Sequence, residues 1–154
     1  MENLKVVASY ICMKYQKEYG VRIDEMKLHK LLYFSQRESL IQNDCPLFEN
    51  TFYGWKYGPV LKEIRKFYRD DVLDEKNTLS PASIKVLDKV FKKYSLKDSW
   101  SLSILTHGEI SWKKSRIGIP EGENGDNEMK LSDIKLDAER IKQRRIIRKQ
   151  LGLA

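Results

Sequence analysis

Hydrophobic residues recur along most of this chain at intervals of three and four positions, which is the pattern of amphipathic helices. The first such stripe consists of Leu4, Val7, Ala8, Ile11, Cys12, Tyr15 and Tyr19. We expect this helix to end at Gly20, because glycine accepts the positive φ of a helix C-terminus. Asp24 is a good N-cap for a second helix. The apolar residues of that helix cover so wide an arc that we expect it at the centre of the domain.

The pattern changes after residue 43, where aromatic residues are mixed with Gly and Pro. This mixture predicts a short β-hairpin or strand pair around residues 51–57. We expect Pro59 in the first turn of the following helix, where its missing N–H is harmless. The predicted apolar stripe of that helix is Val60, Leu61, Ile64, Phe67 and Tyr68.

Capping residues predict where the later helices begin. Ser80, which precedes a proline, and Asp98 are each expected to cap a helix. The chain is expected to turn at Gly108, and residues 121–128, with four acids and no apolar side chain, predict an exposed loop. We expect Ser132 to cap the last helix. The resulting prediction is a mainly α fold, a compact single-domain bundle of about six helices with the short hairpin.

Length and composition agree with one folded domain. The chain has 154 residues, of which 41% are hydrophobic and 33% charged. It has no run of about 18 apolar residues, as a membrane span would need, and no secretory signal is visible at its start. The two cysteines, Cys12 and Cys45, are expected to be reduced thiols. These features predict a cytoplasmic protein without a membrane partner.

The sequence contains no motif that indicates catalysis, a cofactor or a metal. His29 and His107 lie far apart without nearby cysteines, and we expect His29 at the surface or in a groove. His107 and Glu109 lie two residues apart. They form either an acid–base pair, as in a small hydrolase, or a turn whose polar side chains bond to the backbone, and the turn is the simpler interpretation. We therefore predict no catalytic residue, cofactor or metal.

The net charge of +7 permits nucleic-acid or acidic protein partners without selecting one. Its most concentrated part is the last helix, which carries Arg140, Lys142, Arg144, Arg145, Arg148 and Lys149. These residues either contact phosphates or form the solvated face of an amphipathic helix. No aromatic residue interrupts the run, so the stacking pattern of single-strand binders is missing. DNA therefore remains an open but less favoured partner.

Three blocks of sequence carry a resemblance to a known family. The first is MKLHKLLYFSQ (residues 26–36). The second is PLF (46–48) followed by GWKYGPV (54–60), and the third is LSILTHGE (102–109) followed by Trp112. Their order and spacing resemble the Panacea domain of SocA-like antitoxins, a family also labelled phage-associated protein GepA.

The resemblance covers roughly residues 4–136 and divides the chain into a domain of residues 1–139 and a basic helical extension of residues 140–154. It implies an antitoxin that neutralises a toxin encoded by an adjacent gene through direct protein contact, and not an enzyme. It also implies a possible adaptor role that delivers the toxin to a ClpXP-type protease. The chain departs from the family pattern at Gly54, where Ala is frequent, and at Ser111, where Pro is frequent.

The resemblance also indicates candidate partner-binding residues. They are Lys30, Tyr33, Gln36, Trp55, Tyr57, Gly58, Pro59, Thr106, His107 and Trp112. A tight reversal at Gly58-Pro59 would orient the aromatic residues against the second helix and form a preorganised groove for a partner segment. Core packing is the alternative explanation for Trp55, Tyr57 and Trp112. The alternative function is a nucleic-acid-binding, autoregulatory protein that uses the basic terminal helix.

Overall fold

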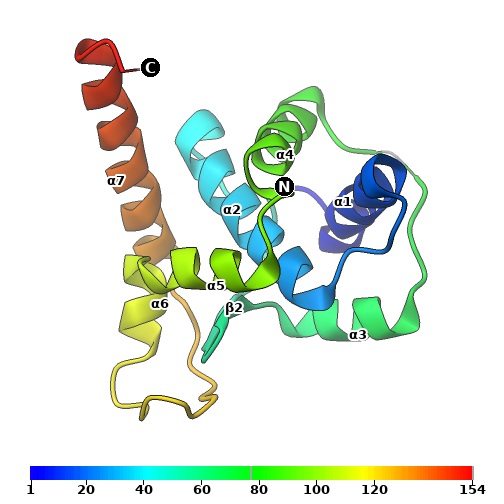
Figure 1. The fold of residues 1–154 in the computed structure, drawn as a ribbon, viewed down its shortest axis with the longest axis horizontal. Helices are drawn as coiled ribbons and strands as arrows, with labels where there is room; N and C mark the ends of the chain where they lie inside the picture. The colour runs from blue at the N-terminus through cyan, green and yellow to red at the C-terminus, as the bar shows by residue number, and fades with distance from the viewer. Residues whose placement is uncertain (77, 154) are drawn as a thin grey trace.

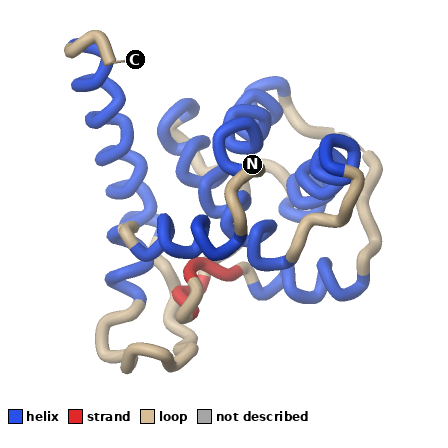
Figure 2. Tube along the Cα trace, in the orientation of Figure 1, coloured by secondary structure: helices blue, strands red, loops and turns tan. Residues whose placement is uncertain are grey.

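One central helix organises the fold. The computed structural model describes residues 1–76 and 78–153, and this part contains seven helices and one two-stranded sheet (Figures 1 and 2). The elements are α1 (Leu4–Tyr19), α2 (Glu25–Asn43), β1 (Tyr53–Trp55), β2 (Gly58–Val60), α3 (Lys62–Asp70), α4 (Pro81–Tyr94), α5 (Ser99–His107), α6 (Ile110–Ser115) and α7 (Leu131–Gln150). The predicted mainly α fold is confirmed.

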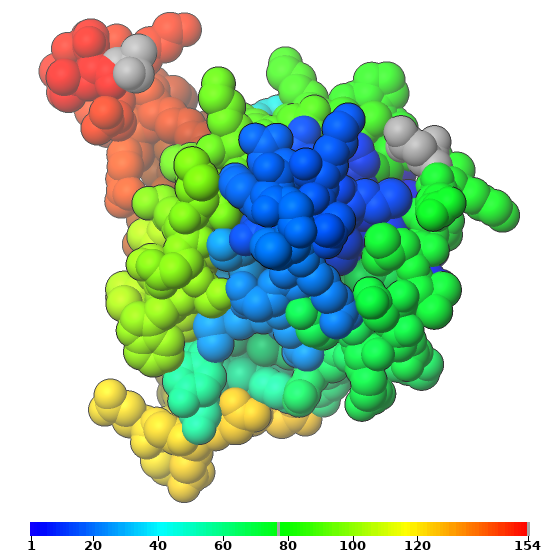
Figure 3. All heavy atoms as spheres, turned by 45° about the vertical axis from the view of Figure 1, so that its right-hand side comes forward, coloured from blue at the N-terminus to red at the C-terminus, as the bar shows by residue number. Residues whose placement is uncertain are grey.

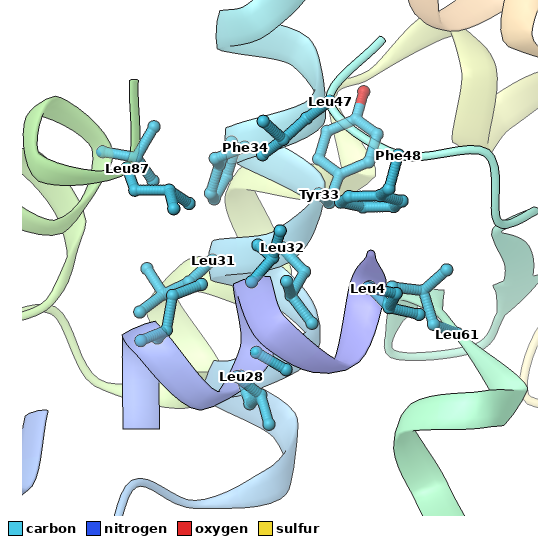
Figure 4. Packing of buried hydrophobic residues seen from close by; sticks show 14 of the residues in the cluster. Leu4, Leu28, Leu31, Leu32, Tyr33, Phe34, Leu47, Phe48, Leu61 and Leu87 are labelled. Atoms are coloured by element: carbon cyan, nitrogen blue, oxygen red, sulfur yellow. The ribbon is translucent and has the colours of Figure 1, made fainter. Parts of the chain in front are cut away.

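Helix α2 lies at the centre, as its wide apolar arc predicts. Fourteen consecutive residues, Lys27 to Leu40, are buried. Helices α1, α3, α4, α5 and α7 and strand β2 all contact α2. Figure 4 shows its apolar side chains packed against residues of α1, α4 and the 47–61 segment. The core is therefore one cluster around a helix that is enclosed on all sides.

Local capping chemistry starts and ends the helices where the sequence indicates. The Asp24 carboxylate accepts a 2.8 Å hydrogen bond from the Lys27 amide. Ser80 and Asp98 cap α4 and α5 in the same way, through the amides three residues ahead. Gly20 ends α1 with a φ of 72°. Each cap satisfies an amide or reverses the chain at a helix end, so these boundaries follow from local sequence.

The predicted hairpin is present, but Pro59 is not in a helix. β1 and β2 pair antiparallel with Gly54 opposite Pro59, and α3 begins only at Lys62. Proline also suits an extended strand position where no ladder N–H is needed. The expected placement of Pro59 in a first helical turn is therefore wrong, and Val60 and Leu61 likewise precede the helix.

Two further expectations are corrected. α7 begins at Leu131 with Lys130 as its N-cap, so Ser132 lies inside the first turn. The Met129 amide donates to the Phe52 carbonyl at 2.8 Å, which anchors the chain just before α7. His29 is not at the surface or in a groove but is 3% exposed, and its Nδ1 accepts from the Leu61 amide at 3.2 Å. The start of α7 and the burial of His29 both depend on contacts between segments that are distant in the sequence.

The loop of residues 121–128 and the last turns of α7 are more exposed than the body of the molecule. Residues 121–128 are mostly exposed, as predicted, and this loop and the last turns of α7 project from the body (Figure 3). None of the helices in the described residues has the length and apolar character of a membrane-crossing segment.

Gln36 carries a stability prediction. Its buried amide accepts from the Leu47 amide at 2.7 Å and the Phe48 amide at 3.3 Å, and it donates to the Phe48 carbonyl at 2.9 Å. Gln36→Leu would leave these backbone groups unsatisfied, so we expect a loss of at least about 2 kcal/mol in urea unfolding. Gln16→Leu, on the exposed side of α1, is the matched control, with an expected change within about 0.5 kcal/mol. Equal effects would contradict this role of Gln36.

Candidate functional site

The three sequence blocks meet at the β-hairpin. Lys30 of α2 donates from Nζ to the Pro59 carbonyl at 3.2 Å. Gly58 has a φ of 114°, and a Cβ there would lie 2.5 Å from Thr106 Oγ1 and 2.8 Å from Lys30 Cε. Ser103 of α5 donates to the Tyr57 carbonyl. The hairpin is therefore held between α2 and α5, and only glycine fits at position 58.

Burial is the main cause of the pKa shifts at this junction. Lys30 is 1% exposed, and burial lowers its pKa to about 7, although Asp24 and Glu25 favour its charged form. Burial also lowers the pKa of His107, whose ring stacks on Trp112 with centroids 4.2 Å apart. Trp112 in turn donates from Nε1 to the Trp55 carbonyl at 2.8 Å. These side chains join the hairpin to α2, α5 and α6.

A buried polar network lies beside this junction. The Tyr33 hydroxyl is 3.0 Å from Glu109 Oε2 and 3.0 Å from Asp137 Oδ2, and 3.1 Å from the Ser111 hydroxyl. Arg37 forms an ion pair with Glu109 at 2.5 Å. Burial raises the pKa of Glu109, which the Arg37 charge opposes, and it raises the pKa of Tyr33 well above its usual range. The network connects α2, α6 and α7.

Sequence reasoning missed Arg37 and Asp137. Asp137 accepts hydrogen bonds from the Ile110 amide at 2.6 Å and the Ser111 amide at 3.0 Å, so a residue of α7 caps α6. In the sequence, Asp137 is recognisable as a polar residue within the otherwise apolar stripe of α7 that contains Ile134 and Ala138. The departure at Ser111 also has a consequence, because proline at this position could not donate to Asp137. The Glu109 carboxylate bonds to the Arg37 and Tyr33 side chains and not to His107. It also makes no hydrogen bond that caps α6, so the expected turn with side chains bonded to the backbone is not what the structure shows for Glu109.

The predicted partner-binding residues fall into two groups. Tyr33 and Gln36 are interior residues bonded to the chain itself, so they do not line an open groove with Trp55 and Tyr57. The other buried members are Lys30, Gly58, Pro59 and Thr106. Trp55, His107 and Trp112 are partly buried, and Tyr57 is 43% exposed. Most of the motif residues thus hold the hairpin in place.

An exposed apolar ridge runs along α5 beside the hairpin tip. It consists of Tyr57, Trp100 (58% exposed) and Ile104 (57% exposed), and we call it the α5 ridge. The Tyr57 and Trp100 rings are 5.7 Å apart and tilted by 60°. Exposed aromatic residues grouped in this way are typical of protein–protein contact sites. Trp100 and Ile104 lie one turn apart on α5 and are not among the residues predicted to bind a partner.

The basic residues of α7 are also divided. Arg145 binds Glu38 through two hydrogen bonds of 2.8 and 2.9 Å. Arg140 donates to the Gly108 carbonyl and Arg148 to the Leu153 carbonyl. Lys142, Arg144 and Lys149 are exposed. Arg145 therefore attaches α7 to α2, and Arg140 and Arg148 bond to backbone carbonyls of the chain.

The described residues contain no group of three or more His, Cys, Asp or Glu side chains that could hold a metal ion. What the arrangement offers is a rigidly held hairpin, the α5 ridge and a cationic last helix, which are features of a binding protein.

Comparison with known families agrees with this description. The model of the family "antitoxin SocA-like, Panacea domain" matches residues 28–113, which is more than half of the chain. The chain therefore belongs to this family. The match contains the hairpin, the second and third sequence blocks and the first block from Leu28 onward, and α7 lies outside it. The comparisons with curated proteins and with solved structures give no match.

Gly54 carries a prediction about packing. A Cβ at Gly54 would lie 1.8 Å from Ser115 Oγ and 2.8 Å from Ser115 Cβ. Gly54→Ala is expected to destabilise the chain by about 1–3 kcal/mol through overpacking. Adding Ser115→Gly should recover part of this loss, because it removes the clashing atoms. The measurement is a double-mutant cycle by urea unfolding, and strictly additive effects would contradict the proposed clash.

Glu38 carries a prediction about pH. Although burial raises its pKa, hydrogen bonds from Arg145, Gln42 and Lys89 outweigh this and hold the pKa at about 2, against an ordinary value of 4.5. Its stabilising contribution is therefore present above pH 4.5 and is lost as the pH falls toward 2. Glu38→Gln should lower the free energy of unfolding at pH 7, with the difference shrinking toward pH 2.

The control for this prediction is Glu18→Gln, on the exposed side of α1. It should leave the pH profile of unfolding unchanged. A Glu38→Gln profile parallel to that of the unsubstituted chain would show that the Glu38–Arg145 pair does not stabilise the fold.

Proposed function

We propose that this protein is an antitoxin that neutralises a cognate toxin, encoded by an adjacent gene, by direct protein–protein binding in the cytoplasm. Membership of the SocA-like antitoxin family supports the class of function. The protein acts by binding and not by catalysis in this proposal, because the polar groups around the motif residues bind other parts of the chain.

The α5 ridge is the observation that carries the proposal. The large apolar side chains of the ridge are hydrated in the free protein, and moving them out of water into an interface is favourable. An exposed Trp–Tyr pair therefore favours association. The backbone beneath Tyr57 is held by Ser103, and the following Pro59 is held by Lys30. A ridge that is already ordered loses little conformational entropy on binding.

Delivery of the bound toxin to a ClpXP-type protease is a separable part of the proposal. It predicts a shorter toxin half-life in the presence of this protein. An unchanged half-life together with full neutralisation would exclude the adaptor role and leave inhibition by binding.

A second candidate function is nucleic-acid binding by α7. It is favoured by Lys142, Arg144 and Lys149, which are exposed and form no ion pair with any described residue. Contacts made by these cations alone would be salt-dependent and indifferent to sequence.

Co-expression with the product of the adjacent gene tests the main proposal. We expect that product to arrest growth and this protein to restore it. Trp100→Ala should weaken toxin binding by roughly 30-fold, as for a hot-spot residue worth about 2 kcal/mol. Its melting temperature should change little, because the side chain is more than half exposed.

Ile104→Ala is a second variant within the ridge. The matched control is Val72→Ala, at a similarly exposed apolar residue after α3. Ile104→Ala should weaken binding and Val72→Ala should not. An adjacent product that is not toxic, or is toxic and not neutralised, would overturn the proposed function. Full neutralisation by the Trp100→Ala variant would place the interface elsewhere.

A further inference from the structure

A groove lies between α4, α5 and α7, with α2 as its floor. It has a volume of about 520 Å³. Figure 1 shows α4 and α7 on either side of α2, with α5 running across one end. Four exposed cations line this groove, Lys93 and Lys97 on the α4 side and Arg140 and Arg144 on the α7 side. We call it the basic groove.

The positive charge of the basic groove is not neutralised within the described chain. None of its four exposed cations forms an ion pair with a described residue. Two neighbouring cations, Lys89 and Arg145, are by contrast both paired with Glu38. The groove therefore keeps an excess of positive charge that an acidic ligand would complement.

The floor of the groove adds no compensating negative charge. Its acidic member, Glu109, is paired with Arg37 at 2.5 Å. Arg37 also donates to the Tyr94 hydroxyl at 3.0 Å, and its buried Nε has no acceptor among the described residues. The charge presented by floor and walls together is strongly positive.

Apolar side chains lie between the charged walls. Leu105 is 44% exposed and Ile141 is partly exposed, and the Phe34 ring on the floor stacks on Tyr94 at 4.2 Å. Beyond the groove lie two further exposed apolar residues four positions apart, Ile147 of α7 and Leu151 at its C-cap. The surface is thus amphipathic, with cations flanking an apolar strip.

We infer that the basic groove binds an acidic, amphipathic segment of the toxin, a point that rests on the proposed function. Carboxylates of such a segment would meet the cations on both walls, and its apolar side chains would cover Leu105 and Ile141. Leu105 follows Ile104 on α5, so one edge of the basic groove and the α5 ridge lie on the same helix. One toxin can therefore cover both surfaces.

The same features favour a protein segment over nucleic acid. A phosphate backbone has no apolar side chains that could cover the strip between the walls. Its phosphates would also be bound equally well by cations elsewhere on α7. Lys142 and Lys149 provide such cations: helical spacing puts them on the side of α7 away from Arg140 and Arg144. The two sides of α7 can therefore be compared directly.

The test compares two double variants with the same change in charge. Lys93→Glu with Arg144→Glu reverses the groove, and Lys142→Glu with Lys149→Glu reverses the other side of α7. All four residues are exposed. The probe is a fluorescent peptide of about 15 residues built of alternating Glu and Leu pairs. Its Lys-for-Glu counterpart and an oligothymidylate are the comparison ligands, and all are measured by anisotropy.

The unsubstituted chain should prefer the acidic peptide to both comparison ligands. The groove variant should lose about tenfold or more in affinity, and the control variant should lose less than about threefold. No binding of the acidic peptide, equal losses in both variants, or equal affinity for oligothymidylate would each overturn the inference.

The peptide arm does not depend on the toxin, so its failure is distinguishable from failure of the proposed function. A second arm repeats the comparison with the toxin product. A groove variant that binds and neutralises the toxin like the unsubstituted chain would overturn use of the groove by the toxin, while leaving the antitoxin function standing.

Discussion

The structure depends on the burial of residues 27–40 of α2 together with their polar side chains. A buried polar group is costly unless it finds a hydrogen-bond partner, so each of these residues needs a partner in a surrounding element. Lys27 bonds to the end of α4, His29 to the start of α3, Lys30 to β2, Tyr33 to α6 and α7, Gln36 to residues 47 and 48, and Glu38 to α7. The polar residues of one helix thereby fix where almost every other element lies.

This arrangement separates the residues that define the fold from those available to a partner. Lys30, Gly58 and Thr106 meet inside the molecule, where they hold the hairpin. The α5 ridge and the basic groove lie on the outside of the same framework. The motif residues therefore contribute to the framework, while the α5 ridge and the basic groove remain exposed on it.

Much of the fold follows from local rules. Asp24, Ser80, Asp98 and Gly20 act at helix ends because their effects need only neighbouring amides. The errors arose where a distant contact competes with a local preference. Pro59 fits both a helix start and a strand, and its pairing with β1 selects the strand. Of the candidate site, the motif residues could be identified from the sequence, but Trp100, Ile104, Arg37 and Asp137 could not, because exposure and cross-helix contacts are not local properties.

A mainly helical chain with a central second helix, an aromatic hairpin and a cationic terminal helix follows from the amino-acid sequence alone, because periodicity, capping and charge can be assessed one segment at a time. Which polar residues are buried and which aromatic residues are exposed emerges only when the helices pack together. This packing also divides the cations of α7, bonding Arg145 to Glu38 and leaving Arg144 unpaired along the groove. Burial and ion pairing depend on which distant segments meet. The hydrogen bonds made by the buried polar side chains of α2 determine which segments these are.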